Sequence, residues 1–213
     1  MKLAAPQLPA VLDPSTVAAM VQDGELENAR LADEDAVNTN CAALGLSGVK
    51  IDKVQFMSAH FERINARDVI VMQSDFSGTS LSNGNCNRVT FTNCRMTGFD
   101  ANKASLHDVI FRGCKLDLAN FRFSDLRRVQ FIDCTLAETD FLSATLRDVG
   151  FQNCILERTV FEKIKVQKLD LRTSQLSEVA GWQSLKGALI DNVQLSAVAP
   201  YLAHALGLIV RDD

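Results

Sequence analysis

The chain has 213 residues, with 22 Lys and Arg against 26 Asp and Glu, so its formal net charge at pH 7 is −4. A hydrophobic share of 47% is enough for a packed core and excludes a disordered chain. No run of about eighteen apolar residues occurs, so no transmembrane helix is expected. Pro6 and Pro9 interrupt the apolar N-terminus, which argues against a secretory signal and favours a cytoplasmic protein.

Residues 1–23 do not follow the pattern of the rest of the chain. Asp13-Pro14-Ser15-Thr16, followed by Val17, Met20 and Val21, predicts a short helix with Pro14 at its first position. A solenoid must hide its terminal layers, so this N-terminal segment is interpreted as a lid, with a swapped or mobile arm as the alternative.

The middle of the chain repeats one unit every twenty residues. The pattern Val-x-Phe-x-x-Cys begins at Val89, Val109, Val129 and Val149. Self-similarity at a fixed period is typical of a solenoid, whose units bury their apolar faces only by stacking. The sequence therefore predicts a stacked core, without naming a partner or a chemistry.

A finer period of five lies inside the twenty. An apolar or small residue recurs at every fifth position from Leu26 to Leu176, which gives thirty-one centres without an insertion. Five fits neither a helix nor a simple strand, but an inward pair followed by a two-residue corner makes one short side, and four sides make one square coil. About seven coils at about 4.8 Å give a rod about 35 Å long. Glu34 breaks the inward pattern, so the first coil is predicted to be irregular.

Corner and core positions repeat as well. Asn93, Gly113, Asp133 and Asn153 follow the Val-x-Phe sides and are residue types that tolerate positive φ. Phe91, Phe111, Phe131 and Phe151 fill one predicted core column, and Leu106, Leu126 and Leu146 fill another.

At these residues the chain resembles the pentapeptide repeat family, whose loose motif is Ala-(Asp/Asn)-Leu-x-x with Phe allowed at the centre. Ala119-Asn120-Phe121, Thr139-Asp140-Phe141 and Ser74-Asp75-Phe76 match this motif, whereas large and small residues are exchanged at Phe99 and Ala101. The resemblance implies an all-β solenoid over residues 24–180, a right-handed quadrilateral parallel β-helix with short helical caps at the termini.

Residues 181–213 are predicted to form a cap. Asp191 is a candidate N-cap with Gln194 three residues later, and Gly207 ends the helical pattern, while Pro200 either kinks the helix or starts a second one. One apolar face carries Leu195, Val198, Leu202 and Leu206. Leu208-Ile209-Val210 predicts a short strand. This helix-plus-strand tail resembles the C-terminal caps of pentapeptide repeat proteins, some of which protect topoisomerases and form a homodimer there; the face is thus a dimer surface or a cap on its own solenoid.

Two residue types could carry chemistry. Cys94, Cys114, Cys134 and Cys154 form a column whose parallel side chains do not converge tetrahedrally on zinc, so they are interpreted as buried reduced thiols, with an oxidised pair or an adventitious metal as alternatives. His60, His107 and His204 have no recurring catalytic partner and are interpreted as surface residues. A flat rod without a pocket is a poor enzyme, so we predict no catalytic residue, cofactor or metal.

Charge bears on the choice of partner. By family resemblance, some members protect DNA gyrase and topoisomerase IV, the targets of quinolones, by imitating duplex DNA. Residues 44–175 hold 18 bases against 15 acids, and the excess acids lie outside them, which weakens a DNA-mimic role. No basic patch interleaved with aromatic residues occurs, so direct nucleic-acid binding is not expected.

Two outward patterns are candidate contact surfaces. A corner column alternates in sign through Asp68, Arg88, Asp108, Arg128, Asp148 and Lys168, which predicts an exposed ion-pair ladder that either holds the coils in register or forms a docking strip. The outward positions Ile70, Met72, Thr90, Thr92, Ile110 and Ile132 reflect either strand propensity or a protein contact patch. The leading hypothesis is a non-catalytic interaction scaffold with an unidentified protein partner; the alternative is a topoisomerase-binding protection factor.

Overall fold

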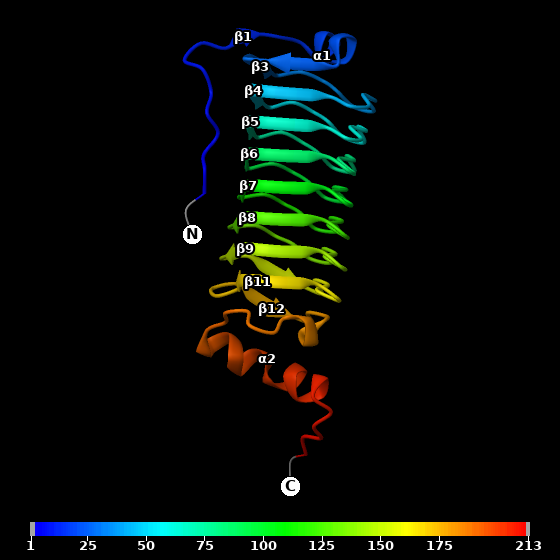
Figure 1. Ribbon diagram of the computed structural model, residues 1–213. Coiled ribbons are helices and arrows are strands. Elements are labelled where there is room, and N and C mark those ends of the chain that lie inside the picture. The colour runs from blue at the N-terminus through cyan, green and yellow to red at the C-terminus, as the bar shows by residue number, and fades with distance from the viewer. Residues whose placement is uncertain (1–2, 212–213) are drawn as a thin grey trace.

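Stacked coils form a straight rod, with one helix at each end (Figure 1). The computed structural model describes residues 3–211. The elements that begin the chain are β1 (Asp13–Pro14), α1 (Val17–Asp23), β2 (Glu25–Glu27) and β3 (Ala29–Ala32). Six eight-residue strands follow, namely β4 (Gly45–Asp52), β5 (Asn65–Met72), β6 (Asn85–Thr92), β7 (Ser105–Arg112), β8 (Asp125–Ile132) and β9 (Thr145–Gln152). The chain ends with β10 (Ile155–Glu157), β11 (Lys165–Asp170), β12 (Gln175–Ser177), the 3-10 helix η1 (Trp182–Ser184) and α2 (Asn192–Ala205).

All strand pairs are parallel, and from β2 onward the paired residues lie twenty positions apart, whereas Asp13 of β1 pairs with Ala29. Val89 pairs with Val109, and Val109 with Val129, in a sheet that runs in the order β1-β3-β4-β5-β6-β7-β8-β9-β11. Each long strand turns in its middle, at Asp68 in β5, and so covers two sides of a coil. The other two sides pair through single bridges such as Asp75 with Arg95 and Ser80 with Asp100. The predicted parallel β-solenoid with four-sided coils is therefore confirmed.

Every coil turns its corners through a left-handed residue. From Asn28 to Glu178, each fifth residue has a positive φ, including the predicted corners Asn93, Gly113, Asp133 and Asn153. A left-handed conformation costs most residues about 1–2 kcal/mol. Hydrogen bonds between coils offset this cost, as where the Asn93 N–H donates to the Arg112 carbonyl at 2.8 Å.

Phenylalanine rings fill the interior in two columns. Phe91, Phe111, Phe131 and Phe151 stack with centroid separations of 5.0, 4.9 and 4.7 Å and nearly parallel planes. Phe121, Phe141 and Phe161 form the second column, at 5.1 and 5.2 Å, and meet the first edge-to-face. Stacked and edge-to-face pairs each add about 0.5–1.5 kcal/mol beyond burial of the rings. The repeated Phe thus supplies both the core and the registration of the coils.

The N-terminal end is closed by α1. Thr16 is its N-cap, because the Thr16 hydroxyl accepts from the Ala19 N–H, and Met20 is fully buried over the first coil. The prediction that Pro14 opens the helix is wrong, since Pro14 lies in β1, paired with Arg30 of β3. Glu34 does not disturb the coil backbone; its carboxylate accepts the Val17 N–H at 3.3 Å, at the start of α1.

The C-terminal end is closed by η1 and α2. Helix α2 runs without a break through Pro200, begins with the predicted capping box of Asp191 and Gln194, and buries Val198. The strand expected at residues 208–210 does not form within the described part of the chain, since Leu208, Ile209 and Val210 pair with no neighbouring strand and are exposed. Among residues 3–211, no helix is long and apolar enough to span a membrane.

Candidate docking surface

One outer side of the rod is almost free of charge. We call it the flat face and define it by the outward residues Ile70, Met72, Thr90, Thr92, Ile110 and Ile132. Ile70 pairs with Thr90, and Thr90 with Ile110, so these side chains form a continuous row across neighbouring strands. All six are half-buried, because each is flanked along the rod by the same position in the next coil.

The flat face differs from the other three sides in charge. Between residues 70 and 152 its outward positions carry one charged residue, Arg112, whereas each other side carries at least three over the same coils. A sheet surface with few charges costs little to desolvate, so a partner can cover it without leaving charges unpaired.

A corner column of paired charges borders this face. Arg88 makes two hydrogen bonds to Asp68 at 2.6 and 2.5 Å, and Arg128 binds Asp108 in the same way and at the same distances. Lys168 lies 3.3 Å from Asp148. The structure thus brings all six predicted ladder residues together as three pairs, each with the base one coil after the acid.

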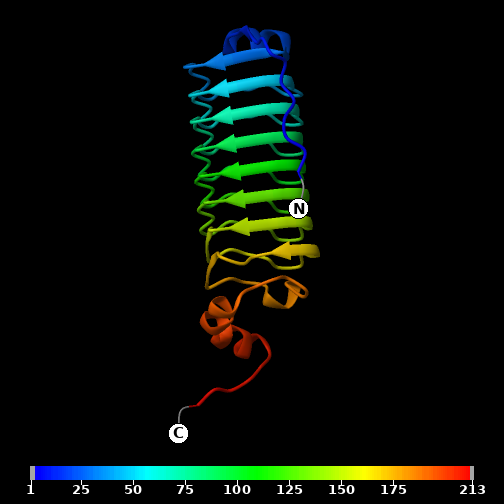
Figure 2. The same cartoon turned by 90° about the vertical axis from the view of Figure 1, so that its left-hand side faces the viewer.

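The sequence predicts an exposed ladder, but two of its carboxylates are largely covered in the structure. The side chains of Asp68 and Asp108 are only 12% and 7% exposed, whereas that of Asp148 is 38% exposed. Arg88 and Arg128 cover these two carboxylates together with the N-terminal arm, residues 3–12, which runs outside the coils along one margin of the strands (Figures 1 and 2). The Gln7 N–H donates to Asp68 Oδ1 at 2.9 Å and the Ala4 N–H to Asp108 Oδ1 at 3.3 Å.

Two further contacts fix the course of the arm. The Asp13 N–H donates to the Asn28 carbonyl at 3.0 Å and so anchors the arm at the first coil. Gly48 occupies the next corner with φ +65°, where a Cβ atom would lie 2.6 Å from Asn28 Oδ1 and 3.5 Å from Pro9 Cδ. The absent side chain leaves room for the Asn28 side chain, and Pro9 of the arm lies at ordinary contact distance from this corner.

Both covered carboxylates are kept ionised by their partners. The Arg88 guanidinium holds the pKa of Asp68 below its ordinary value, against the opposing effect of burial, and the Gln7 N–H adds to the lowering. Arg128 and then the Ala4 N–H do the same for the pKa of Asp108. Each carboxylate therefore holds one guanidinium and one N–H of the arm.

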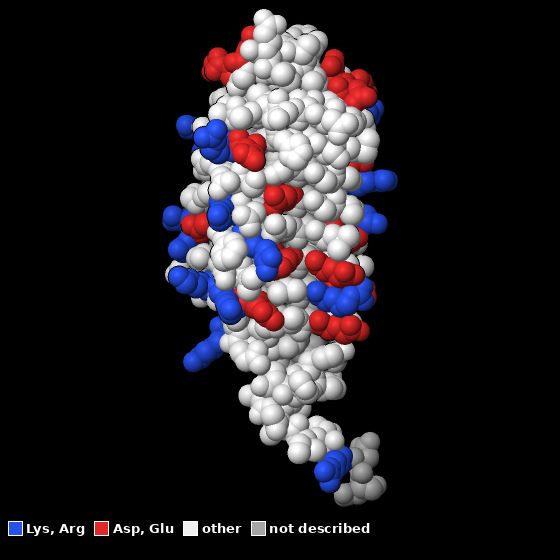
Figure 3. Space-filling model, turned by 90° about the vertical axis from the view of Figure 1, so that its right-hand side faces the viewer, with Lys and Arg blue, Asp and Glu red and all other residues white. Residues whose placement is uncertain are grey.

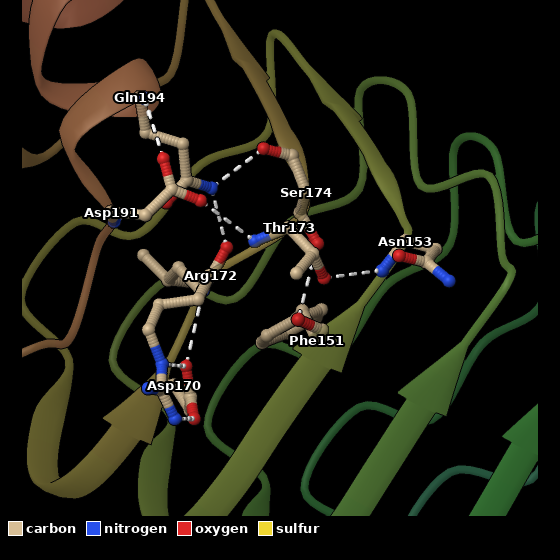
Figure 4. Close-up of polar contacts among 9 residues, drawn as sticks. Phe151, Asn153, Asp170, Arg172, Thr173, Ser174, Asp191 and Gln194 are labelled. Carbon is tan, nitrogen blue, oxygen red and sulfur yellow. Dashed lines mark hydrogen bonds and ion pairs between the residues drawn. The ribbon is translucent and has the colours of Figure 1, made fainter.

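The cap meets the last coil through a polar network (Figure 4). Gln194 Nε2 donates to the carbonyls of Leu171 and Ser174, each at 2.6 Å. A side chain of α2 therefore satisfies two backbone acceptors of the last coil. Asp191 Oδ2 accepts the Thr173 N–H at 3.2 Å. This network explains why Gln194, an amide, is buried where the solenoid stops.

An open groove of about 730 Å³ lies where the flat face meets the cap, although the sequence predicted no pocket. Gly150, Leu189 and Asp191 help to line it. Its bases are paired with its acids, Lys168 with Asp148 and Arg172 with Asp170 at 2.7 Å. The groove therefore offers paired charges, and not an unpaired nucleophile or base.

The predicted cap face is divided. Val198 is fully buried and Leu202 half-buried, whereas Leu195 and Leu206 are exposed. The exposed pair extends into the exposed apolar residues Leu208, Ile209 and Val210. Only part of the face thus covers the solenoid.

The cysteines and histidines are not brought together into a reactive set. Cys94, Cys114, Cys134 and Cys154 are buried free thiols whose Sγ atoms donate to backbone carbonyls, for example Cys134 to Phe111 at 3.4 Å. Cys41 and Cys86 are buried outside this column, and burial raises the pKa of the Cys86 thiol to about 12. His60 and His204 are exposed and His107 is half-buried. Within residues 3–211, no group of three His, Cys, Asp or Glu could hold a metal ion.

The charge of the surface is mixed. Figure 3 shows the side that faces right in Figure 1, with acidic side chains at the N-terminal end and both signs interleaved along the rest of the rod. This agrees with the near-balance of 18 bases and 15 acids over residues 44–175. The rod does not present a continuous negative surface on this side.

Two solved structures match this chain at low sequence identity. HetL, a protein involved in the regulation of heterocyst differentiation in the cyanobacterium Nostoc sp. strain PCC 7120, matches with 17% identity and a TM-score of 0.55 over 79% of this chain and 87% of its own. Full-length QnrB1, a plasmid-mediated fluoroquinolone resistance protein, matches with 19% identity and a TM-score of 0.47 over 89% and 94%. The comparison with curated proteins gave no match.

The family model described as pentapeptide repeat region matches residues 44–121 and 104–180. Together the two matches span more than half of the chain and coincide with the coils whose corners, core columns and strand register are described above. The chain belongs to the pentapeptide repeat family.

Proposed function

We propose that the protein is a non-catalytic scaffold whose flat face binds a protein partner. The observation that carries this proposal is the continuous, weakly charged row of Ile70, Thr90 and Ile110 on an otherwise charged rod. The stacked phenylalanine core behind these strands holds the face rigid, so binding requires little ordering of side chains.

The flat face is smaller than the area that a stable protein interface buries. Five coils at about 4.8 Å and four residues at about 3.3 Å give about 24 by 13 Å, or roughly 300 Å². A stable interface buries about 800 Å² on each partner. The partner must therefore extend past the flat face onto its margins, where the ladder and the arm lie.

The state of the ionisable groups supports a binding role over a catalytic one. In the groove beside the cap, Lys168 and Arg172 are each paired with an acid. All six thiols are buried, and those of Cys94, Cys114, Cys134 and Cys154 donate to backbone carbonyls. General acid–base catalysis needs a group that is free to reach a substrate.

A photo-crosslinking residue placed at Thr90 tests the flat face directly. The matched control is the same replacement at Thr97, a half-buried threonine on another side of the rod. We expect a specific adduct from position 90 only, and at least tenfold weaker binding of the crosslinked partner after Ile110→Lys but not after Thr97→Lys. Equal adducts at both positions, or none, would rule out the flat face.

A second copy of the chain is the proposed occupant of the exposed part of the cap. Leu195, Leu206 and Ile209 are apolar and exposed together at the end of the rod, and association of two copies would cover them. Light scattering should give twice the chain mass, and Leu206→Asp should reduce it to the monomer mass. A monomer in both cases contradicts this arrangement.

Binding to a type II topoisomerase remains the alternative function, and it rests on the family resemblance. The mixed charge of the rod disfavours it, because a DNA mimic needs continuous negative charge. A supercoiling assay with purified gyrase and a quinolone decides the matter. We expect neither inhibition nor protection at micromolar protein, and protection would replace the unidentified partner with a topoisomerase.

A further inference from the structure

The N-terminal arm and the ladder share one spacing. The two bonded N–H groups, on Ala4 and Gln7, are three residues apart, and their acceptors Asp108 and Asp68 are two coils apart. Three residues of polyproline II helix rise about 9.3 Å. Two coils rise about 9.6 Å. A chain in this conformation therefore meets a carboxylate on every second coil without stretching.

The sequence of the arm favours that conformation. The proline ring fixes φ of Pro6 and Pro9 at about −65°. The residues before them, Ala5 and Leu8, are restricted to extended or polyproline II geometry. The arm has neither helix nor strand from residue 3 to residue 12. Leu3 and Pro6, again three residues apart, are half-buried. Leu8 is half-buried as well and Pro9 is exposed, so the period of three describes the two donors and not the burial of the arm's side chains.

The arm binds to a preformed acceptor site, the carboxylates of Asp68 and Asp108. Arg88 and Arg128 hold their carboxylates in place with two hydrogen bonds each, and one oxygen of each carboxylate also accepts an arm N–H. The arm itself is held lightly, because Ala4, Ala5 and Gln7 are exposed. A segment bound through two backbone donors can be displaced by one that makes the same bonds and additional contacts.

We infer that the corner column from Asp68 to Arg128 is a docking strip for a polyproline II segment of another protein, and that the arm occupies it in cis. This inference rests on the proposed scaffold role and names the chemistry of the partner: an extended segment with a Pro-x-x-Pro spacing, small residues, and free N–H groups three residues apart. Such a segment also lies beside Ile70 and Ile110 and supplies the contact area that the flat face alone lacks.

The test uses the full-length protein and a fluorescent, acetylated peptide with the sequence of residues 3–12. In the protein, the double substitution Ala4→Pro and Gln7→Pro removes both N–H donors and keeps the arm extended. The matched control is Ala5→Pro, at a residue whose N–H makes no hydrogen bond in the structure. Peptide binding is measured by anisotropy up to millimolar protein.

We expect the peptide to bind the double variant at least tenfold more tightly than it binds the wild type or the Ala5→Pro protein, because the arm no longer competes. A second peptide that carries the same two proline substitutions should bind at least tenfold more weakly, and Asp108→Asn in the double variant should weaken the native peptide likewise. Equal binding of the two peptides, or no binding to the double variant, overturns the inference.

Two further outcomes have distinct meanings. Dimers that form in the wild type and dissociate in the double variant would show that the strip takes the arm of a second copy, which also overturns the inference. Loss of peptide binding alongside an intact adduct at Thr90 would leave the scaffold proposal standing. Peptide binding without that adduct would instead remove the flat face and keep the strip.

Discussion

The inner phenylalanine columns and the outer corner column follow the same twenty-residue period. Side-chain exposure is uniform along the inner columns but varies along the corner column. Phe111, Phe131 and Phe151 are all at most 2% exposed, because each packs between apolar side chains of the coils on either side. Asp108 and Asp148 occupy equivalent corners, yet their side chains are 7% and 38% exposed. The repeat determines what points inward, whereas the cover of the outer residues also depends on the arm, which bonds to Asp68 and Asp108, and on the base at the next corner.

The largest expected loss of stability comes from a substitution in an inner column. Phe131→Ala should lower the free energy of unfolding by about 3–5 kcal/mol, because it opens a cavity in a stacked row. The control is Phe123→Ala, at a corner residue that is 54% exposed. That change should stay within about 0.5 kcal/mol. Urea unfolding of both variants measures the difference. Similar losses of unfolding free energy would show that the inner position 131 and the corner position 123 do not differ in packing.

A smaller effect compares the covered and uncovered parts of the ladder. Asp108→Asn should cost about 1.5–3 kcal/mol, because it weakens charge-assisted hydrogen bonds in a covered site. Asp148→Asn, at the more exposed pair with Lys168, should cost about 0–1 kcal/mol. Thermal unfolding of the two variants side by side checks the order, and a larger loss at Asp148 would contradict the covering role of the arm.

At the cap, Gln194→Ala should destabilise the last coil by about 1–3 kcal/mol, because the carbonyls of Leu171 and Ser174 lose their shared donor. Gln183→Ala, at an exposed glutamine of η1, serves as the control and should have no comparable effect. Hydrogen exchange should accelerate around residues 171–177 in the first variant only. Unchanged exchange there would mean that α2 does not secure the end of the rod.

The covered carboxylates also predict a pH dependence. The folded-state pKa values of Asp68 and Asp108 lie below their ordinary value of 3.8, so their stabilising contribution is present above about pH 4 and is lost as the pH falls through the folded values. The double variant Asp68→Asn and Asp108→Asn should therefore lose less stability than the wild type between about pH 5 and pH 2. Parallel acid titrations of the two proteins would contradict the lowered pKa values.

The sequence predicts the solenoid because one period decides the direction of each side chain. Phe91 and its equivalents repeat without an insertion, so both the columns and the corners could be placed from residue numbers alone. The course of the arm could not be predicted, since its bonds at Asp68 and Asp108 join residues 61 and 104 positions apart through backbone N–H groups. Pro6 and Pro9 are a sequence signal for an extended arm, but they do not indicate which part of the rod the arm contacts.

The ends were predicted only in part, for local reasons. The capping box at Asp191 and Gln194 is a short-range pattern, and it was placed correctly. Pro14 was misplaced because Thr16 is the better cap, with a hydroxyl that reaches the Ala19 N–H. The strand expected at Leu208-Ile209-Val210 was inferred from composition, but no strand is available beside it in the described chain.

Amide hydrogen exchange of the arm tests most directly whether the arm lies on the ladder. The Gln7 amide should exchange at least tenfold more slowly than the Ala5 amide, because it donates to Asp68 Oδ1 at 2.9 Å. Asp68→Asn should reduce that protection. Equal exchange of the two amides in the wild-type protein, at the rate of an unstructured peptide, would contradict the covered ladder and the docking strip with it.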